Sequence, residues 1–343
     1  MHCYTSITNN YFPKARVLAQ TLARYNPEWK LHVILSEPVH PAIDPATEPF
    51  ASIVGIDEIG IPDLMAFLFM HRVTEICTAV KGIAAQYLIR KHALRKIVYF
   101  DPDIAIFNDL SPLSDLLDAH PILLAPHLSK PEVTAQAVVD NEICALRHGV
   151  FNLGFLGLRA EGQGLDFLEW WTQRNLEHCF DDIPLGLFTD QRWCDFAPIF
   201  FDQLYILREP QYDVATWNLQ QRTLSMGQDG TLLVDGLPLR FYHFSGYDTH
   251  AGRGIVRRLF EDRSHVIHEV WAWYDTALKA NGQALLGSSP WFYSTFSDGT
   301  PITSPMRTQY RSRPDLQAAF PNPFDTDQRP QSFLRWCKIN LTP

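Results

Sequence analysis

Two aspartates placed one residue apart are the residues of this sequence best suited to chemistry. The run at 96–107 is rich in Ile, Val, Tyr and Phe, which favours a buried strand, and Asp101 and Asp103 interrupt it. On extended backbone these carboxylates point the same way and repel each other unless a cation neutralises them. Such ligands suit Mg²⁺ or Mn²⁺, which often also hold substrate phosphates. An ordinary loop with one helix-capping and one exposed aspartate explains the motif equally well.

The elements before this run predict how the aspartates are held. Strand-like stretches at 3–8, 31–35 and 51–56 alternate with helical apolar spacing at 13–25 and 74–92. This alternation predicts an α/β fold with a mostly parallel central sheet flanked by helices. Ligands of such sheets bind beyond the carboxyl ends of the strands, so a turn at Thr5-Ser6 and the two aspartates are expected to border one cleft.

Later segments bring further groups that could do chemistry. They are Asn152 in a glycine-rich strand at 149–159, Asp190-Gln191 before a helix at 192–196, Trp217-Asn218 in a loop, and His243 after a strand at 237–241. Each has an ordinary explanation when taken singly. Asp190 is then a helix cap, Trp217 fills the core, and His243 is a satisfied histidine.

In the order of these segments, the chain resembles the retaining GT-A glycosyltransferases related to glycogenin and to bacterial lipopolysaccharide galactosyltransferases. The resemblance spans roughly residues 1–250. The motifs are Tyr-x-Asp-x-Asp at 99–103, Phe-Asn-x-Gly at 151–154, Asp-Gln at 190–191, Trp-Asn at 217–218 and His-Phe-x-Gly at 243–246. The resemblance implies a GT-A fold and the transfer of a sugar from a nucleotide diphosphate sugar, most simply a UDP-sugar, with retention of configuration.

The resemblance also implies roles for individual residues. Asp101, Asp103 and His243 are expected to bind Mn²⁺ or Mg²⁺, and Asp190 with Gln191 is the expected catalytic pair. The expected donor-binding residues are Thr5, Ser6, Tyr11, Lys81, Asn152, Trp217, Asn218 and Gly246. For Lys81, the alternative is a solvated helix face.

One departure from the family pattern concerns the donor phosphates. The family often continues the His-Phe-x-Gly run with Lys-Pro-Trp, whose lysine holds a donor phosphate. Here Tyr247-Asp248-Thr249-His250 follows, and Arg253 is the nearby cation that could substitute.

The predicted organisation is a catalytic domain at 1–265 and a C-terminal appendage at 266–343 packed on it. Within the catalytic domain, about 1–110 forms the nucleotide-binding part and about 111–265 the acceptor and sugar part. The appendage begins with a helix at 266–280 and continues as an aromatic, proline-rich stretch without periodicity. Its aromatic residues could form an acceptor wall or a partner surface, although ordinary packing is the favoured explanation.

Composition narrows the class of protein further. The formal net charge of −9 argues against nucleic acid as a partner, because phosphate backbones need clustered Lys and Arg. The six cysteines contain no C-x-x-C pair, which favours free thiols in a reducing compartment. Neither a signal-peptide pattern nor an apolar run of 18 residues is visible, so we expect a soluble cytoplasmic protein, with peripheral association at the inner face of the membrane left open.

The expected function is therefore transfer of a sugar to a glycan or glycolipid acceptor, in bacterial surface-polysaccharide or lipopolysaccharide synthesis. A sugar nucleotidyltransferase is an alternative, but the sequence lacks a glycine-rich basic N-terminal loop. An aspartate-nucleophile phosphatase would leave the later motifs unexplained. A non-enzymatic carbohydrate-binding scaffold would need neither the aspartates nor His243. Oligomeric state is not indicated.

Overall fold

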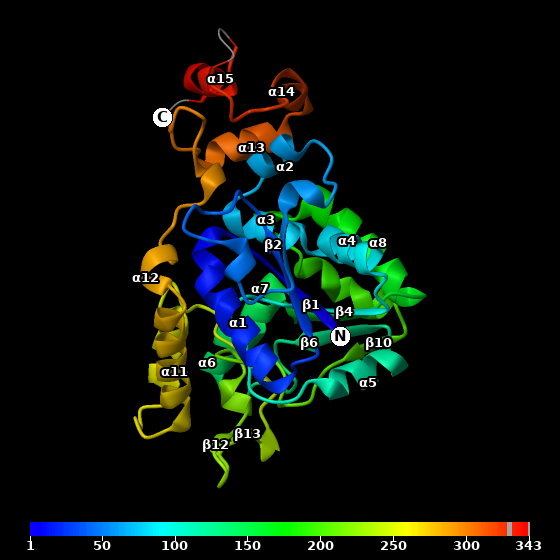
Figure 1. Cartoon of the computed structure of the whole chain (residues 1–343), viewed down its shortest axis with the longest axis vertical. Coiled ribbons are helices and arrows are strands. Elements are labelled where there is room, and N and C mark those ends of the chain that lie inside the picture. The colour runs from blue at the N-terminus through cyan, green and yellow to red at the C-terminus, as the bar shows by residue number, and fades with distance from the viewer. Residues whose placement is uncertain (328–330, 342–343) are drawn as a thin grey trace.

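The computed structural model describes residues 1–327 and 331–341, and its centre is a seven-stranded sheet of order β10-β6-β7-β4-β1-β2-β3 (Figure 1). The strands of this sheet are β1 (His2–Ile7), β2 (Lys30–Leu35), β3 (Ser52–Gly55), β4 (Lys96–Phe100), β6 (Ile122–Pro126), β7 (Phe151–Arg159) and β10 (Leu204–Ile206). Strand β1 runs parallel to β2 and β4, and β7 runs antiparallel to β4 and β6. The predicted α/β fold with a mostly parallel central sheet is confirmed.

Helices cover both faces of this sheet, and further helices pack around them. They are α1 (Phe12–Tyr25), α2 (Leu64–Met70), α3 (Val73–Ala79), α4 (Lys81–His92), α5 (Ser111–Ala119), α6 (Ala135–Ala137), α7 (Cys144–His148), α8 (Gln163–His178), α9 (Ala197–Phe200), α10 (Ala251–Leu259), α11 (Val266–Ala280), α12 (Gln283–Leu286), α13 (Ser304–Ser312), α14 (Pro314–Ala319) and α15 (Phe333–Asn340). Side chains alternate along β4, so Val98 and Phe100 pack with α1 and α5, whereas Ile97 and Tyr99 pack with α3, α4 and α8.

A second, three-stranded sheet of order β11-β15-β5 positions the candidate site. It consists of β5 (Ile104–Ile106), β11 (Val214–Ala215) and β15 (Phe241–His243). Strand β15 pairs antiparallel with β5, with His243 opposite Ile104, so His243 is placed beside Asp103 although the two are distant in sequence. The remaining strands form a two-stranded hairpin of β8 (Asp181–Asp182) and β9 (Leu187–Phe188), and a three-stranded antiparallel sheet of β12 (Leu224–Met226), β13 (Leu232–Val234) and β14 (Leu237–Pro238).

Several predicted elements differ in detail from those observed. The run at 96–107 is two strands, β4 and β5, which lie in different sheets and are joined by the segment that carries the aspartates. The predicted helix at 74–92 divides at Val80 into α3 and α4. The expected turn at Thr5-Ser6 is wrong, since both residues are hydrogen-bonded strand residues of β1, where their small side chains are buried.

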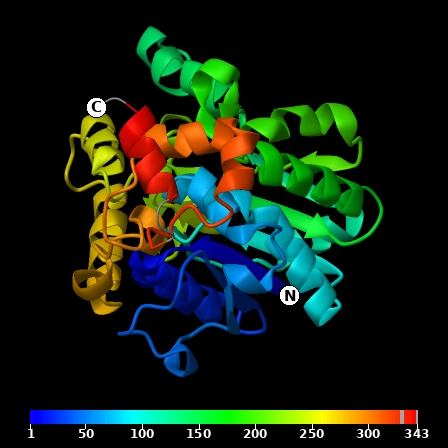
Figure 2. The same ribbon diagram turned by 90° about the horizontal axis from the view of Figure 1, so that it is seen from above.

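The C-terminal segment contributes to the main core. The aromatic residues Trp291, Phe296, Tyr310 and Phe333 pack in the same hydrophobic cluster as α2, and α11 lies beside α1 (Figure 2). The predicted helix at 266–280 is confirmed as α11. The boundary at 265 stays a prediction. Within the described ranges, every helix is too short or too polar to cross a bilayer.

Candidate active site

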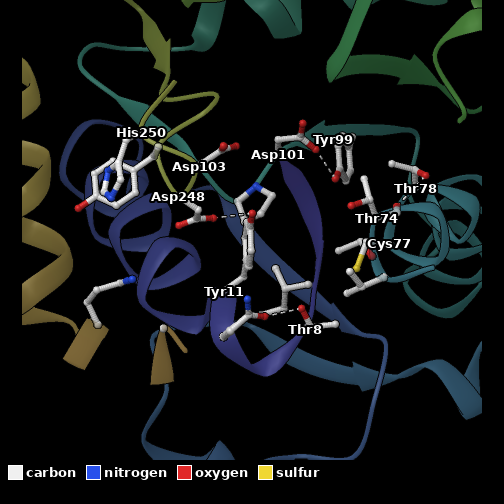
Figure 3. A pocket seen from close by; sticks show the side chains of 18 residues that line it. Thr8, Tyr11, Thr74, Cys77, Thr78, Tyr99, Asp101, Asp103, Asp248 and His250 are labelled. Atoms are coloured by element: carbon white, nitrogen blue, oxygen red, sulfur yellow. Dashed lines mark hydrogen bonds between the residues drawn. The ribbon is translucent and has the colours of Figure 1, made fainter. Parts of the chain in front are cut away.

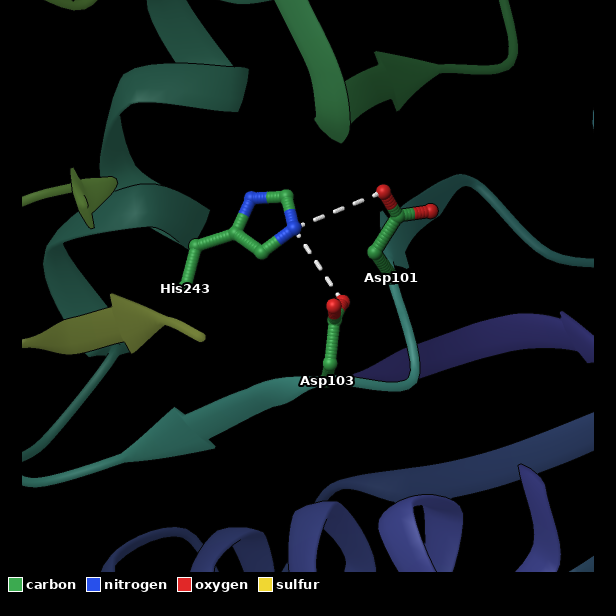
Figure 4. Close-up of side chains that lie close together, drawn as sticks. All are labelled: Asp101, Asp103 and His243. Atoms are coloured by element: carbon green, nitrogen blue, oxygen red, sulfur yellow. Dashed lines mark ion pairs between the residues drawn. The ribbon is translucent and has the colours of Figure 1, made fainter. Parts of the chain in front are cut away.

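The two aspartates and the distant histidine form one cluster at the carboxyl end of β4 (Figure 4). Nε2 of His243 lies 3.1 Å from Oδ1 of Asp103 and 3.7 Å from Oδ2 of Asp101. Each residue offers one ligand atom, and these atoms lie within 4.8 Å of one another. Two carboxylates and an imidazole suit Mn²⁺ or Mg²⁺, so the donor set fits the predicted divalent cation.

Backbone hydrogen bonds fix this cluster in place. The amide of Asp101 donates to the carbonyl of Gly154 on β7 at 2.7 Å, and the amide of Phe244 donates to the carbonyl of Asp103 at 2.9 Å. Gly154 must be a glycine, because a Cβ there would lie 2.5 Å from Cε1 of His243. The glycine at this position of β7 thus reflects the close approach of the imidazole.

The electrostatics of the cluster keep Asp103 and His243 charged. Burial raises the pKa of Asp103, but the charge of His243 and then that of Lys14 outweigh this and lower it to about 2. Burial lowers the pKa of His243, yet the surrounding carboxylates, Asp103 foremost, hold it well above its usual range. The cluster therefore attracts a cation, and a bound metal would compete with the proton on the imidazole.

Asp213 is a site residue that sequence reasoning missed. Its Oδ1 lies 3.6 Å from Nδ1 of His243, on the side of the ring away from the cluster, and its carboxylate is 1% exposed. A carboxylate behind a metal-binding histidine fixes the ring orientation and raises its basicity as a ligand. Asp213 precedes β11, which pairs with β15 next to His243.

A second buried charge cluster lies beside the first. Nζ of Lys81 is 3.0 Å from Oδ2 of Asp190 and 3.4 Å from Oδ1 of Asp101, and it donates to the carbonyl of Leu153 at 2.8 Å. Burial lowers the pKa of Lys81, but Asp101 and Asp190 more than offset it and keep the lysine protonated. The alternative of a solvated face for Lys81 is wrong, because its side chain is buried. The alternative of a helix cap for Asp190 is also wrong, because Gln191 occupies the N-cap position of the helix that follows. The helix after Gln191 is a short 3-10 helix, Arg192–Phe196.

Two adjoining cavities meet at the aspartates. The first, of about 620 Å³, is lined by residues that include Ser6, Thr8, Tyr11, Thr74, Cys77, Asp248 and His250 (Figure 3). The second, of about 440 Å³, is lined by residues that include Lys81, His127, Asn152, Asp190, Gln191, Trp217 and His243. Asp101 and Asp103 line both cavities, as do Thr74 and Thr78. Most of the predicted site residues are therefore brought together.

Backbone hydrogen bonds hold two amide side chains in the second cavity. Oε1 of Gln191 accepts from the amide of Leu153 at 3.2 Å, and Oδ1 of Asn152 accepts from that of Gly154 at 3.1 Å. The Trp217 ring stands edge-on to His243, with ring centroids 5.3 Å apart.

Four sequence-derived residues lie outside the lining of both cavities. Thr5 is fully buried in β1, and the Asn218 amide is used in backbone contacts with Asp213 and Ala215. Gly246 forms a turn with φ +72°, which glycine adopts readily. Arg253 is bound to Asp275 at 2.5 Å, and neither residue lines either of these cavities, so Arg253 does not reach the site as the substitute phosphate cation.

Comparison with known proteins finds two curated relatives. The chain is 31% identical over 177 residues to YfnF, an uncharacterized protein of Bacillus subtilis (strain 168), a match that covers 51% of this chain and 57% of YfnF. It is 21% identical over 250 residues to YfnD, an uncharacterized protein of the same organism, covering 72% of this chain and 78% of YfnD. The chain thus spans little more than half the length of YfnF. No protein-family model matches it.

Solved structures of glycosyltransferases resemble the chain at low identity. Galactosyltransferase LgtC, in complex with donor and acceptor sugar analogues, gives a TM-score of 0.47 at 16% identity, covering 84% of this chain and 98% of that one. Glycosyltransferase GlyE of Streptococcus pneumoniae TIGR4 gives 0.43 at 16% identity, covering 86% and 66%. Mouse xyloside xylosyltransferase 1 gives 0.43 at 12% identity, covering 71% and 97%.

Proposed function

We propose that this chain is a metal-dependent GT-A glycosyltransferase that moves a sugar from a nucleotide diphosphate sugar to a glycan or glycolipid acceptor. The observation that carries the proposal is the position of Asp101 and Asp103, which line both cavities. A nucleotide sugar has the same order, with a nucleoside at one end, a charged diphosphate in the middle and a sugar at the other end. Both cavities have volumes typical of small-molecule sites.

The residues of the cluster fit the metal that this reaction needs. Asp101, Asp103 and His243 would hold it, with Asp213 orienting the imidazole. A divalent cation at this place supplies electrostatic stabilisation for the negative charge of a leaving diphosphate. We take Mn²⁺ as the first choice and Mg²⁺ as the second.

The second cavity supplies the groups that a transferred sugar requires. Lys81 holds Asp190 as a buried carboxylate at the cavity wall, where it can stabilise positive charge near an anomeric carbon or accept from sugar hydroxyls. Gln191 and Asn152 are held by backbone contacts and present amide groups to the same space. Trp217 offers an apolar ring that could pack against a sugar face.

The finer parts of the proposal rest on the sequence resemblance. It favours uridine diphosphate as the carrier, retention at the anomeric carbon, and a cytoplasmic role in bacterial surface-polysaccharide or lipopolysaccharide synthesis, with peripheral contact at the membrane. In this assignment Ser6 and the ring of Tyr11 border the nucleoside side of the donor, because both residues line the first cavity.

Nucleotide binding tests the proposal before the donor sugar is known. In calorimetric titrations with UDP, GDP, ADP and CDP, one of the four should bind to the protein in the presence of Mn²⁺. Its affinity should fall at least tenfold when EDTA removes the metal, and also in the Asp103→Ala variant. Asp229→Ala, an exposed aspartate on the β12-β13 hairpin, is the control with the same charge change. Metal-independent binding that survives Asp103→Ala would instead favour a non-catalytic carbohydrate-binding scaffold.

A further inference from the structure

The first cavity lacks a free cation where a nucleotide diphosphate would need one. Among the described residues that line it, there is no lysine or arginine, and Lys81 of the second cavity is already shared by Asp101 and Asp190. The nucleoside diphosphate left after sugar transfer carries more negative charge than one divalent cation neutralises, so such sites usually add charged hydrogen-bond donors from the protein. The Lys14 ammonium is the unassigned cation next to this cavity.

Lys14 lies on α1 beneath the wall of the cavity, and an aspartate covers it. Its side chain is 2% exposed and forms an ion pair with Oδ2 of Asp248, whose own side chain is 43% exposed and lines the cavity. The Tyr11 hydroxyl donates to the same oxygen at 2.8 Å (Figure 3). One carboxylate oxygen on the cavity side is therefore held by an ammonium and a hydroxyl behind it.

The position of this pair suits a phosphate of the donor. Asp248, the partner of Lys14, lines the same cavity as the expected metal-binding residue Asp103, so the ammonium lies behind the wall that borders the expected metal site. Lys14 also lies 3.6 Å from the centroid of the Tyr11 ring, which fixes the two donors relative to each other. Phosphate and carboxylate oxygens accept the same charge-assisted hydrogen bonds, so one can replace the other on these donors.

The segment that carries Asp248 is an irregular turn. It joins β15 to α10, with Gly246 at φ +72° and His250 at φ +59°, and Asp248 contributes its side chain from the exposed part of that turn. Displacing Asp248 would expose the carboxylate to water, where it is well solvated, whereas Lys14 stays held within the fold.

We propose that Lys14 and the Tyr11 hydroxyl form the donor-phosphate subsite, and that Asp248 occupies it until a nucleoside diphosphate displaces the carboxylate. This inference rests on the proposed function. It assigns to α1 the cation that the family's Lys-Pro-Trp segment provides, in a chain that has Asp248 in that region instead. A carboxylate in the subsite makes binding selective for ligands with enough phosphate charge to displace it.

Three variants separate this role from simple charge neutralisation. They are Lys14→Met, Asp248→Asn and the double variant, titrated in Mn²⁺ with the nucleoside diphosphate that the unaltered protein binds best, and with its monophosphate and nucleoside. Lys14→Met should weaken diphosphate binding at least tenfold and nucleoside binding less than threefold. Asp248→Asn should tighten diphosphate binding severalfold, because the competitor is weakened. The double variant should stay as weak as Lys14→Met.

The double variant is decisive because it removes both charges, so neither Lys14 nor Asp248 is left as a charge without its partner. Should Lys14→Met fail to fold, the double variant alone carries the test. Diphosphate affinity equal to that of the unaltered protein would mean that Lys14 merely neutralises Asp248, and would overturn the inference. Equal losses for nucleoside and diphosphate, or a tenfold loss in Arg253→Met, would overturn it too. Lys91→Met on exposed α4 surface is the matched charge control.

These outcomes are distinct from failure of the proposed function. An unaltered protein that binds none of the nucleoside diphosphates with Mn²⁺ overturns the proposed function, and the subsite falls with it. The other case is that the unaltered protein binds one of them in a metal-dependent way and the double variant binds it equally well. The glycosyltransferase proposal then stands, and only the role of Lys14 is removed.

Discussion

Nζ of Lys81 lies 3.0 Å from Oδ2 of Asp190, and both side chains are almost completely buried. The pair joins α4 to the segment before the 3-10 helix Arg192–Phe196, and the same ammonium reaches Asp101 at the metal cluster. The predicted metal-binding and catalytic carboxylates therefore share one lysine. A change at Lys81 is expected to affect stability and donor binding together.

Lys81→Met tests this coupling. Removing one partner of a buried ion pair leaves an uncompensated charge, so the free energy of unfolding should fall by about 3–5 kcal/mol. Lys91→Met, on the exposed face of the same helix, should change it by less than about 0.5 kcal/mol. Urea denaturation followed by circular dichroism measures both. Equal stabilities of the two variants would show that the Lys81 charge is not held as described.

Asp213→Asn tests whether the carboxylate behind His243 supports metal binding. Loss of such an outer partner lowers metal affinity by about 10–100-fold, and we expect a loss in this range for Mn²⁺. Asparagine tolerates the left-handed backbone at φ +48°, so the fold should persist. Electron paramagnetic resonance of free Mn²⁺ gives the affinity, with Asp229→Asn as the control. An unchanged affinity would remove Asp213 from the site.

Gly154→Ala tests the close approach between β7 and the imidazole. The new methyl would lie 2.5 Å from Cε1 of His243 and 2.6 Å from Oδ1 of Asn152, so the ring must move away from the aspartates. Mn²⁺ affinity should fall at least tenfold, and overpacking should cost about 1–3 kcal/mol of stability.

Gly254→Ala in α10 is the matched control for this substitution. A methyl at Gly254 meets no atom within 4 Å, so stability should rise by about 0.4–1 kcal/mol with metal affinity unchanged. A Gly154→Ala protein that still binds Mn²⁺ normally would contradict the described packing of His243.

Acid pH should destabilise the fold through buried histidines outside the metal cluster. Burial lowers the pKa of His71 to about 4, below its value of 6.5 in the unfolded chain. The unfolded chain therefore takes up the proton first, so stability is complete above pH 6.5 and is lost as the pH falls from 6.5 toward 4. Urea denaturation between pH 7 and 4 measures this slope. His71→Gln should reduce it, and an identical slope in the variant would contradict the assignment.

The parts of the site that the sequence could predict are those with a local signature. Asp101 and Asp103 interrupt an apolar run, and His243 lies between two aromatic residues, so their residue types and order are visible in the chain. Asp213 has no such signature, because its contact with His243 depends on the pairing of β11 with β15, a long-range register.

The burial of Lys14 and Lys81 is a feature that their positions in the sequence predict. Lys81 lies on the same helical face as Ala84, Ala85 and Leu88, and Lys14 lies in phase with Leu18 and Leu22. A lysine in the apolar stripe of a helix must be buried with a partner. The partners themselves, Asp190 and Asp248, could not be read from the chain, because separate segments bring them to the lysines only in the fold.

Metal-dependent use of a nucleotide sugar is tested by measuring the release of nucleoside diphosphate from a panel of nucleotide sugars in Mn²⁺. We expect that one nucleotide sugar is slowly hydrolysed, that EDTA stops the reaction, and that added Mn²⁺ restores it. Asp103→Ala should be inactive, while Asp229→Ala should match the unaltered protein. Two results together would contradict a metal-dependent glycosyltransferase. No nucleotide sugar of the panel would be hydrolysed, and nucleotide binding would be changed neither by EDTA nor by Asp103→Ala.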